Sequence, residues 1–135
     1  MSPDVDLVKA FYAAINRNDL EAATRDFDPQ IVRVELEGLP MAGTYRGIEQ
    51  VRENVTAGRG TWAEGTCEPE KLLVHGDKVV VYVHAWVRLK GATDWSGGRF
   101  ADGFVVRGGT IAEFHTFAER KQALEWAGIQ DPDVT

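Results

Sequence analysis

The sequence predicts an α+β fold in which a curved, mostly antiparallel sheet carries three helices on its concave face and a short C-terminal helix. Two observations carry this prediction. Apolar residues recur at helical spacing in the first part of the chain, and from Trp62 to Phe117 they follow strand patterns almost without interruption. The 135 residues contain no repeat, low-complexity segment or linker, so residues 1–135 are expected to form one domain.

Two helices are expected at the N-terminus. Ser2 and Pro3 resemble a helix start, with a capping serine and proline at the first helical position. The apolar positions of this helix are Leu7, Val8, Phe11, Tyr12 and Ile15. Asn18 followed by Glu21 resembles a capping box for a second, short helix that extends to Phe27 and is stopped by Asp28-Pro29.

The next segment alternates as a strand. One face of residues 30–38 carries Ile31, Arg33, Glu35 and Glu37, and the other carries Val32, Val34 and Leu36. A short extended piece follows from residue 41. A third helix then turns Ile48, Val51 and Val55 inward.

Four antiparallel strands are expected after the third helix. Residues 67–74 and 78–90 flank the turn His75-Gly76-Asp77, and residues 99–107 and 110–117 flank Gly108-Gly109. Thr116 followed by Glu119 is a further capping-box pattern, which would open a last helix ending near Gly128.

Composition excludes several classes of function. The net charge is −6 and no basic patch is present, so neither nucleic acid nor an acidic membrane surface is expected as a partner. No apolar run approaches the roughly 20 residues of a membrane span, and the N-terminus lacks a basic leader with an apolar core. These features predict a cytoplasmic protein.

Metal and cofactor motifs are also missing from the sequence. Cys67 is the only cysteine, and no two histidines have metal-ligand spacing. There is no glycine-rich phosphate loop and no nucleophile elbow. We therefore expect neither a metal nor a cofactor.

The order of these elements resembles the NTF2-like superfamily, within it the SnoaL-like proteins and the ketosteroid isomerases. The resemblance spans residues 4–127. It is carried by the segments "FYAAINRNDLEAATRDFDPQIVRVEL", "GTYRGIEQVREN" and "VVRGGTIAEFHTF". It implies a cone whose open end holds a largely apolar pocket, and a homodimer formed through the outer face of the sheet.

The resemblance also implies roles for single residues. Glu35 falls on the general base of the ketosteroid isomerases, and Asp102 on their oxyanion-stabilising acid. Their second donor, a tyrosine, is replaced by Phe11, and Tyr12 lies about 100° further round the helix, so we expect it to point elsewhere. Thr116 replaces the catalytic aspartate of SnoaL-like polyketide cyclases. It also replaces one aspartate of the Asp-Arg-Asp set of epoxide hydrolases in the superfamily, of which Arg99 and Asp102 are present.

Two carboxyl groups in different surroundings can act as separate acid and base. One hypothesis is that Glu35 removes a proton next to a carbonyl while protonated Asp102 stabilises the enolate oxygen, as in ketosteroid isomerase. The alternative is that Glu35 lies on a solvated face with Arg33 and that Asp102 pairs with Arg99 or Arg107.

Further residues are candidate ligand contacts. Alignment with the family places Tyr82, His84 and Trp86 on the cavity side. The alternative, favoured for Trp86, is that they are core aromatics and a histidine whose hydrogen bonds are satisfied. Phe114 and Thr116 are expected to face inward, with His115 outward beside Glu113. The alternation of residues 99–107 places Phe100 and Phe104 on the face of Asp102. The full set of expected ligand contacts is Tyr82, His84, Trp86, Phe100, Phe104, Phe114, Thr116, Phe11 and Arg99.

Two functions follow from these expectations. The first is a cofactor-free isomerase, cyclase or lyase that acts on a small, largely apolar carbonyl compound through Glu35 and Asp102. The second is a non-catalytic module that binds a small molecule or dimerises, favoured by Phe11 and Thr116 at positions that are polar in the family.

Overall fold

The computed structural model describes residues 3–35 and 41–130. The elements are α1 (Pro3–Asn16), α2 (Leu20–Thr24), β1 (Phe27–Glu35), β2 (Gly43–Arg46), α3 (Ile48–Arg59), β3 (Trp62–His75), β4 (Lys78–Leu89), β5 (Ser96–Arg107), β6 (Thr110–Phe117) and α4 (Arg120–Ala127). The strands form one sheet in the order β2-β1-β6-β5-β4-β3. All neighbours are antiparallel except β1 and β6, which run parallel. The predicted α+β class is confirmed.

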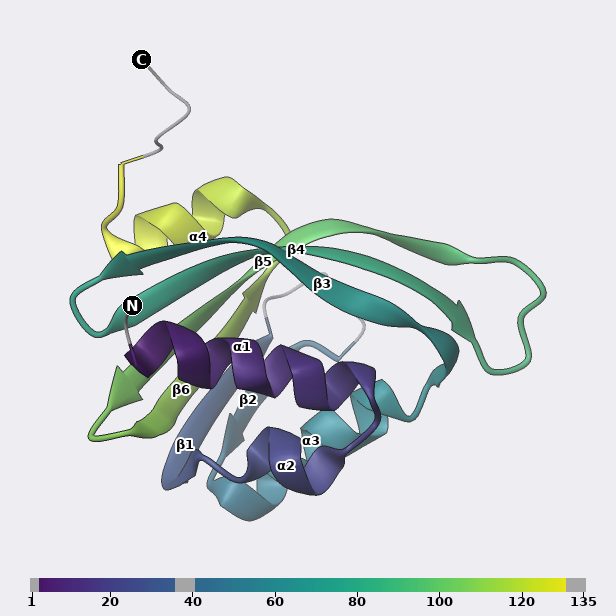
Figure 1. Ribbon diagram of the computed structural model, residues 1–135, viewed down its shortest axis with the longest axis horizontal. Coiled ribbons are helices and arrows are strands. Elements are labelled where there is room, and N and C mark those ends of the chain that lie inside the picture. The colour runs from purple at the N-terminus through teal and green to yellow at the C-terminus, as the bar shows by residue number, and fades with distance from the viewer. Residues whose placement is uncertain (1–2, 36–40, 131–135) are drawn as a thin grey trace.

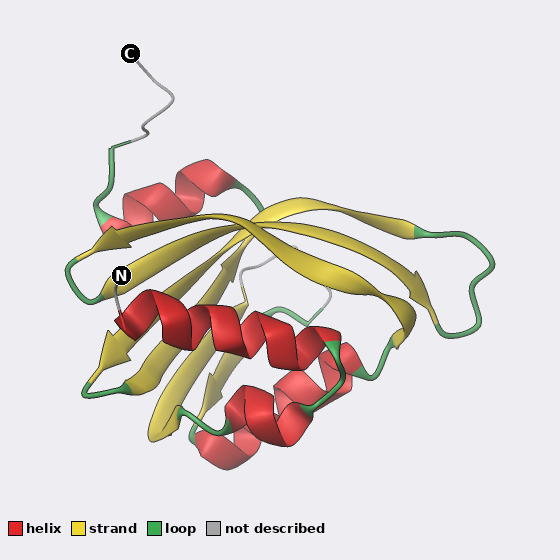
Figure 2. Ribbon diagram, viewed as in Figure 1, coloured by secondary structure: helices red, strands yellow, loops and turns green. Residues whose placement is uncertain are grey.

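The curved sheet lies between α4 on one side and α1, α2 and α3 on the other (Figures 1 and 2). It separates two apolar cores. Helices α1, α2 and α3 cover the concave face, where the larger core includes Val8, Phe11, Ile31, Val81 and Phe104. Helix α4 lies on the opposite face, over a smaller core that contains Val80, Tyr82 and Phe117. Both faces of the middle of β4 and of β5 are therefore buried, whereas Trp86 on β4 and residues 96–99 of β5 are exposed.

The ends of α2 and β1 differ from the sequence prediction. The predicted start of α1 at Ser2 lies outside the described residues. Asp19, and not Asn18, caps α2 by accepting a hydrogen bond from the Ala22 amide, because Asn18 has a positive φ of 59° in the preceding turn. The helix ends at Thr24, so Phe27 already begins a strand.

The C-terminal helix begins later than the capping-box pattern suggested. Its N-cap is Glu119, which forms a reciprocal capping box with Gln122. Thr116 belongs to β6, so the predicted helix-capping role of this threonine is wrong. Its hydroxyl is instead directed to the concave face of the sheet.

Candidate functional site

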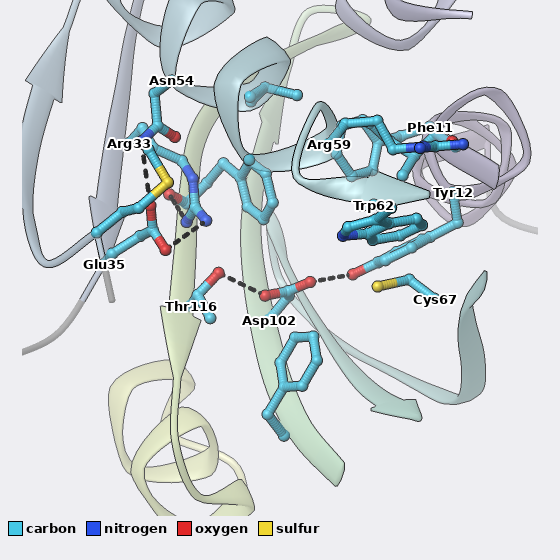
Figure 3. Close-up of a pocket in the computed structure, with 16 residues that line it drawn as sticks. Phe11, Tyr12, Arg33, Glu35, Asn54, Arg59, Trp62, Cys67, Asp102 and Thr116 are labelled. Atoms are coloured by element: carbon cyan, nitrogen blue, oxygen red, sulfur yellow. Dashed lines mark hydrogen bonds and ion pairs between the residues drawn. The ribbon is translucent and has the colours of Figure 1, made fainter. Parts of the chain in front are cut away.

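A cavity of about 200 Å³ lies inside the cone, between the helices and the concave face of the sheet (Figure 3). Its walls come from α1, α3, β1, β3, β5 and β6 and are mostly aromatic or aliphatic. The lining residues are Phe11, Tyr12, Ile15, Arg33, Glu35, Met41, Asn54, Val55, Gly58, Arg59, Trp62, Cys67, Phe100, Asp102, Phe114 and Thr116. A small, largely apolar pocket with a few polar groups has the general form of a ligand site.

The polar groups of the cavity follow from strand register. Glu35 on β1 is paired with Thr116 on β6, and Thr116 is paired with Asp102 on β5. Adjacent strands are about 4.8 Å apart, so the backbones at Glu35 and Asp102 are about 10 Å apart. All three side chains line the cavity, so both carboxyl groups face one space that is wide enough for a small molecule.

Asp102 is the most deeply buried acid of the site, with 3% of its surface exposed. The Tyr12 hydroxyl donates to its Oδ2 at 2.5 Å, and the Thr116 hydroxyl donates to its Oδ1 at 2.7 Å. Figure 3 shows the carboxyl group held between these two hydroxyls, one from α1 and one from β6. The two contacts fix the orientation of the carboxyl plane from opposite sides.

Burial is the main electrostatic influence on this pair. Loss of water raises the pKa of Asp102, and nearby Glu35 adds to the increase, while Arg33 and the two hydroxyl donors oppose it. Burial and the Asp102 carboxyl also raise the pKa of Tyr12 well above its usual value. The arrangement therefore favours neutral forms of both groups.

Glu35 has a different environment. Its Oε2 accepts a hydrogen bond from Asn54 at 3.1 Å, and its Oε1 lies 3.6 Å from the Arg33 guanidinium. The side chains of Glu35 and Arg33 are only 13% and 8% exposed, which excludes the solvated face that was the alternative for these residues. Glu35 thus has a cation and an amide as partners, whereas Asp102 has hydroxyls.

Arg33 is fixed by several contacts at the base of the cavity. One terminal nitrogen donates to the carbonyls of Val34 and Phe114, and the guanidinium lies 3.8 Å from the centre of the Phe114 ring. Burial lowers the pKa of Arg33, and Glu35 is the largest influence that opposes this change. Its buried Nε has no hydrogen-bond partner among the described residues.

The structure brings together six of the predicted site residues around the cavity. These are Phe11, Glu35, Phe100, Asp102, Phe114 and Thr116. Phe104 lies on the same face but is fully buried in the core, where its ring stacks on Phe114 with centroids 4.6 Å apart. His115 faces the other side of the sheet beside Glu113, as expected, with 2.8 Å between Nε2 and Oε1.

The prediction for β4 chose the wrong face of the strand. Val79, Val81 and Val83 face the concave core, whereas Tyr82 belongs to the core beneath α4. His84 and Trp86 share the alternation of Tyr82, and none of these three side chains lines the cavity. Because α4 covers the outer face, both faces of β4 are apolar and alternation alone does not distinguish them.

Arg99 also lies outside the cavity. It is exposed on β5 and forms an ion pair with Glu70 at 2.9 Å, because residues 99 and 102 point to opposite faces of the strand. Arg107 pairs with Asp77. The alternative in which Asp102 is neutralised by Arg99 or Arg107 is therefore wrong.

Tyr12 is the main residue whose role the sequence analysis missed. We expected it to point away from the acid, yet its hydroxyl contacts Asp102 while Phe11 packs against Phe114 beside it. Both positions are buried, at 5% for Phe11 and 3% for Tyr12. The sequence feature that could have indicated this role is the adjacent apolar pair Phe11-Tyr12 on α1. Side chains about 100° apart on a helix can both reach the core.

Nine other lining residues were not singled out as ligand contacts, among them Asn54, Arg59, Trp62 and Cys67. Cys67 is held through its backbone, whose amide and carbonyl both bond the Asn16 side chain at 2.8 and 2.9 Å. Burial raises the pKa of the Cys67 thiol to about 12. A thiol that resists ionisation in this way is a poor nucleophile.

Metal and membrane features can be stated for the described part of the chain. Residues 3–35 and 41–130 contain no group of three or more His, Cys, Asp or Glu side chains arranged to hold a metal ion. Within the same ranges, no helix has both the length and the apolar character needed to span a membrane.

Comparisons with known proteins agree with this architecture. An NTF2-like protein from Burkholderia thailandensis is 27% identical, with a TM-score of 0.76 over 96% of this chain and 100% of that chain. A putative polyketide cyclase from Sinorhizobium meliloti is 25% identical, with a TM-score of 0.67 over 82% and 93%. A protein from Catenulispora acidiphila with a ketosteroid isomerase-like fold, in complex with trimethylamine, is 19% identical, with a TM-score of 0.73 over 92% and 93%.

Among curated proteins, no significant match to the chain is found. The sequence profile of the SnoaL-like domain matches residues 8–114, which is most of the chain. The protein therefore belongs to the SnoaL-like domain family, and its fold is that of the NTF2-like proteins.

Proposed function

We propose that the protein is a cofactor-free acid–base enzyme that removes a proton next to the carbonyl of a small, largely apolar molecule. An isomerase, a cyclase or a lyase would each use this step. The observation that carries the proposal is the row Glu35, Thr116 and Asp102 on three adjacent strands, completed by the Tyr12 hydroxyl on Asp102. It supplies a base and an acid on two sides of one cavity.

In this proposal Glu35 accepts the proton from the carbon next to the carbonyl. The C–H electron pair moves into the new carbon–carbon double bond, and the carbonyl oxygen becomes the enolate oxygen. Neutral Asp102 has one O–H to donate to that oxygen, while its own oxygens accept from Tyr12 and Thr116. Glu35 then returns the proton to the enolate or passes it to a leaving group.

The walls of the cavity support a ligand with an apolar body. Phe11, Phe100, Phe114 and Trp62 contribute aromatic surface, and charged groups are confined to a few positions. Exclusion of water strengthens hydrogen bonds to a developing enolate. The likeness to a putative polyketide cyclase also supports a carbonyl-containing substrate.

A second function, ligand binding without chemistry, is favoured by the partners of Glu35. A carboxylate that is paired with Arg33 and bonded to Asn54 must loosen these contacts before it can accept a proton from a ligand. If it does not, the cavity is a binding site only. In that case a bound carbonyl compound is released unchanged.

Deuterium exchange distinguishes these functions without knowledge of the natural substrate. Acetophenone is incubated with the protein in deuterated water, and incorporation of deuterium at its methyl group is followed by NMR. We expect faster exchange than in buffer, and a loss of about 100-fold or more in Glu35→Gln, as is usual when a general base is removed. Glu64→Gln serves as the matched control, because Glu64 pairs with Arg88 and does not line the cavity.

The two functions give opposite results in this assay. Acetophenone that binds, by calorimetry, but exchanges no faster than in buffer supports the binding module. Exchange that is catalysed equally by Glu35→Gln contradicts the role of Glu35 as the base.

The homodimer implied by the family resemblance is also a proposal for this chain. Its support is three exposed apolar side chains at the end of β4 and in the segment before β5: Trp86, Leu89 and Trp95. Trp86 and Trp95 stack on each other with centroids 6.5 Å apart. Light scattering of the purified protein measures its mass, and a monomer at micromolar concentration would contradict this proposal.

A further inference from the structure

The positive and negative charges of the side chains that line the cavity are not equal in number. Glu35 is paired with Arg33, and burial favours the neutral form of Asp102 although its two hydroxyl donors oppose this shift. Arg59 remains, and among residues 3–35 and 41–130 no carboxylate lies within ion-pair distance of its guanidinium. The lining thus carries one uncompensated positive charge in a protein whose net charge is −6.

Arg59 is held in place by uncharged groups, which do not neutralise its positive charge. Its Nε donates to the Ile15 carbonyl at 2.7 Å, which ties the last turn of α3 to α1. Its guanidinium lies 4.5 Å from the centre of the Trp62 ring. Within the described residues its two terminal nitrogens have no hydrogen-bond acceptor. Such a fixed guanidinium binds a carboxylate with little loss of side-chain entropy.

The position of Arg59 relative to the other polar groups defines the shape of a ligand. Figure 3 shows Arg59 and Trp62 on the side of Asp102 where Tyr12 and Cys67 lie, and Glu35 with Asn54 on the other side. A carbonyl oxygen at Asp102 would therefore have the base on one side and the uncompensated cation on the other. The acidic C–H and an anionic group would then lie at opposite ends of one molecule.

We propose that the ligand of this cavity is a monoanion, a carbonyl compound with an apolar body and a carboxylate that is bound by Arg59. This proposal takes only one point from the proposed function, namely that the ligand's carbonyl lies at Asp102. Burial lowers the pKa of Arg59, which agrees with a cation that is partly removed from water. An anionic ligand would restore the charge balance that the lining lacks.

A matched pair of ligands tests the carboxylate directly. Para-acetylbenzoate and para-acetylbenzamide share the ketone, the ring and nearly the same shape, but only the first carries a charge at physiological pH. Calorimetry gives the two dissociation constants for the unmodified protein. We expect the benzoate to bind at least tenfold more tightly than the benzamide, since a hydrogen bond to a charged group contributes about 1.5 kcal/mol or more.

Variants then assign the preference to Arg59. Arg59→Met should reduce the preference for the benzoate over the benzamide to about threefold or less. Its affinity for the benzamide should be retained, which shows that the site is still folded. Arg59→Lys should keep part of the preference. Arg107→Met removes an equal charge outside the cavity, next to Asp77, and should leave the ratio unchanged.

The outcome is independent of the proposed chemistry. A ratio near one in the unmodified protein, or a ratio that survives Arg59→Met, overturns the inference. Acetophenone exchange that depends on Glu35 would remain valid in either case. Conversely, a benzoate preference that depends on Arg59 without any deuterium exchange would retain the anion site and contradict the enzyme.

Discussion

Replacement of Asp102 by Asn should change how the stability of the protein depends on pH. The carboxyl is buried, and loss of water raises its pKa in the folded state. Between the ordinary value for an aspartate, about 3.9, and the raised value, the folded protein binds a proton that the unfolded chain has released. The stability contributed by the neutral carboxyl is thus complete below about pH 4. It is lost as the pH rises through the folded-state value.

The Asp102→Asn variant has no carboxyl proton at this position, so its stability does not fall in this way as the pH rises. The difference in free energy of unfolding, Asp102→Asn minus wild type, should therefore increase by up to about 1.4 kcal/mol for each pH unit across this interval. Asn can still occupy the space between Tyr12 and Thr116, because its amide group has a similar shape and both accepts and donates hydrogen bonds.

Urea denaturation followed by circular dichroism, at pH values from about 4 to 8, measures this difference. Asp77→Asn is the matched control. Asp77 is partly exposed and paired with Arg107, so its replacement does not remove a buried carboxyl. Parallel stability curves for wild type and Asp102→Asn would refute the conclusion that burial dominates at this carboxyl.

Three other replacements or reactions test the site and its supports. Tyr12→Phe should slow acetophenone exchange, by less than the roughly 100-fold of a lost oxyanion donor, because the Tyr12 hydroxyl orients the Asp102 carboxyl and does not itself bond the enolate; circular dichroism checks that the fold is preserved. Gly103→Ala should lower the free energy of unfolding by about 1–3 kcal/mol, because a Cβ there would lie 2.4 Å from the Trp126 ring. Thermal denaturation measures this loss. Gly98→Ala on the same strand is the control, since a Cβ at Gly98 meets nothing within 4 Å. Cys67, whose pKa is raised to about 12, should react with iodoacetamide at pH 8 much more slowly in the folded protein than in urea.

The sequence predicted β5 correctly, and the physical reason is simple alternation. Phe100, Asp102 and Phe104 share one face because strand side chains alternate strictly, and an acid between two phenylalanines marks the face that lines a cavity. The same rule failed for β4, where Val81 and Tyr82 are both buried. Alternation identifies a buried face only when the other face is solvated, and here α4 covers it.

Helix α1 shows a second limit of pattern reasoning. The position of the family tyrosine corresponds to Phe11 in this sequence, so Tyr12 was expected to point away from Asp102. In the structure α1 packs so that both rings lie on the concave side, with an edge-to-face contact at 5.3 Å between them. The long phenol of Tyr12 then reaches Asp102 across the core. Helical angle alone does not give this reach, which depends on how the helix is seated on the sheet.

The assignment of acid and base follows from the partners of the two carboxyl groups. Glu35 has a guanidinium at 3.6 Å and an amide donor, whereas burial raises the pKa of Asp102 more than its two hydroxyl donors lower it. Arg33 lies next to Glu35 and also opposes the rise in the Asp102 pKa, but burial is the larger influence on Asp102. In the proposed mechanism the charge lies on Glu35 and the proton on Asp102, which is the direction in which burial shifts the Asp102 pKa. This is the distribution that proton abstraction by Glu35 requires, and it predicts that Arg33→Met, which removes the compensating charge, impairs exchange without touching either carboxyl.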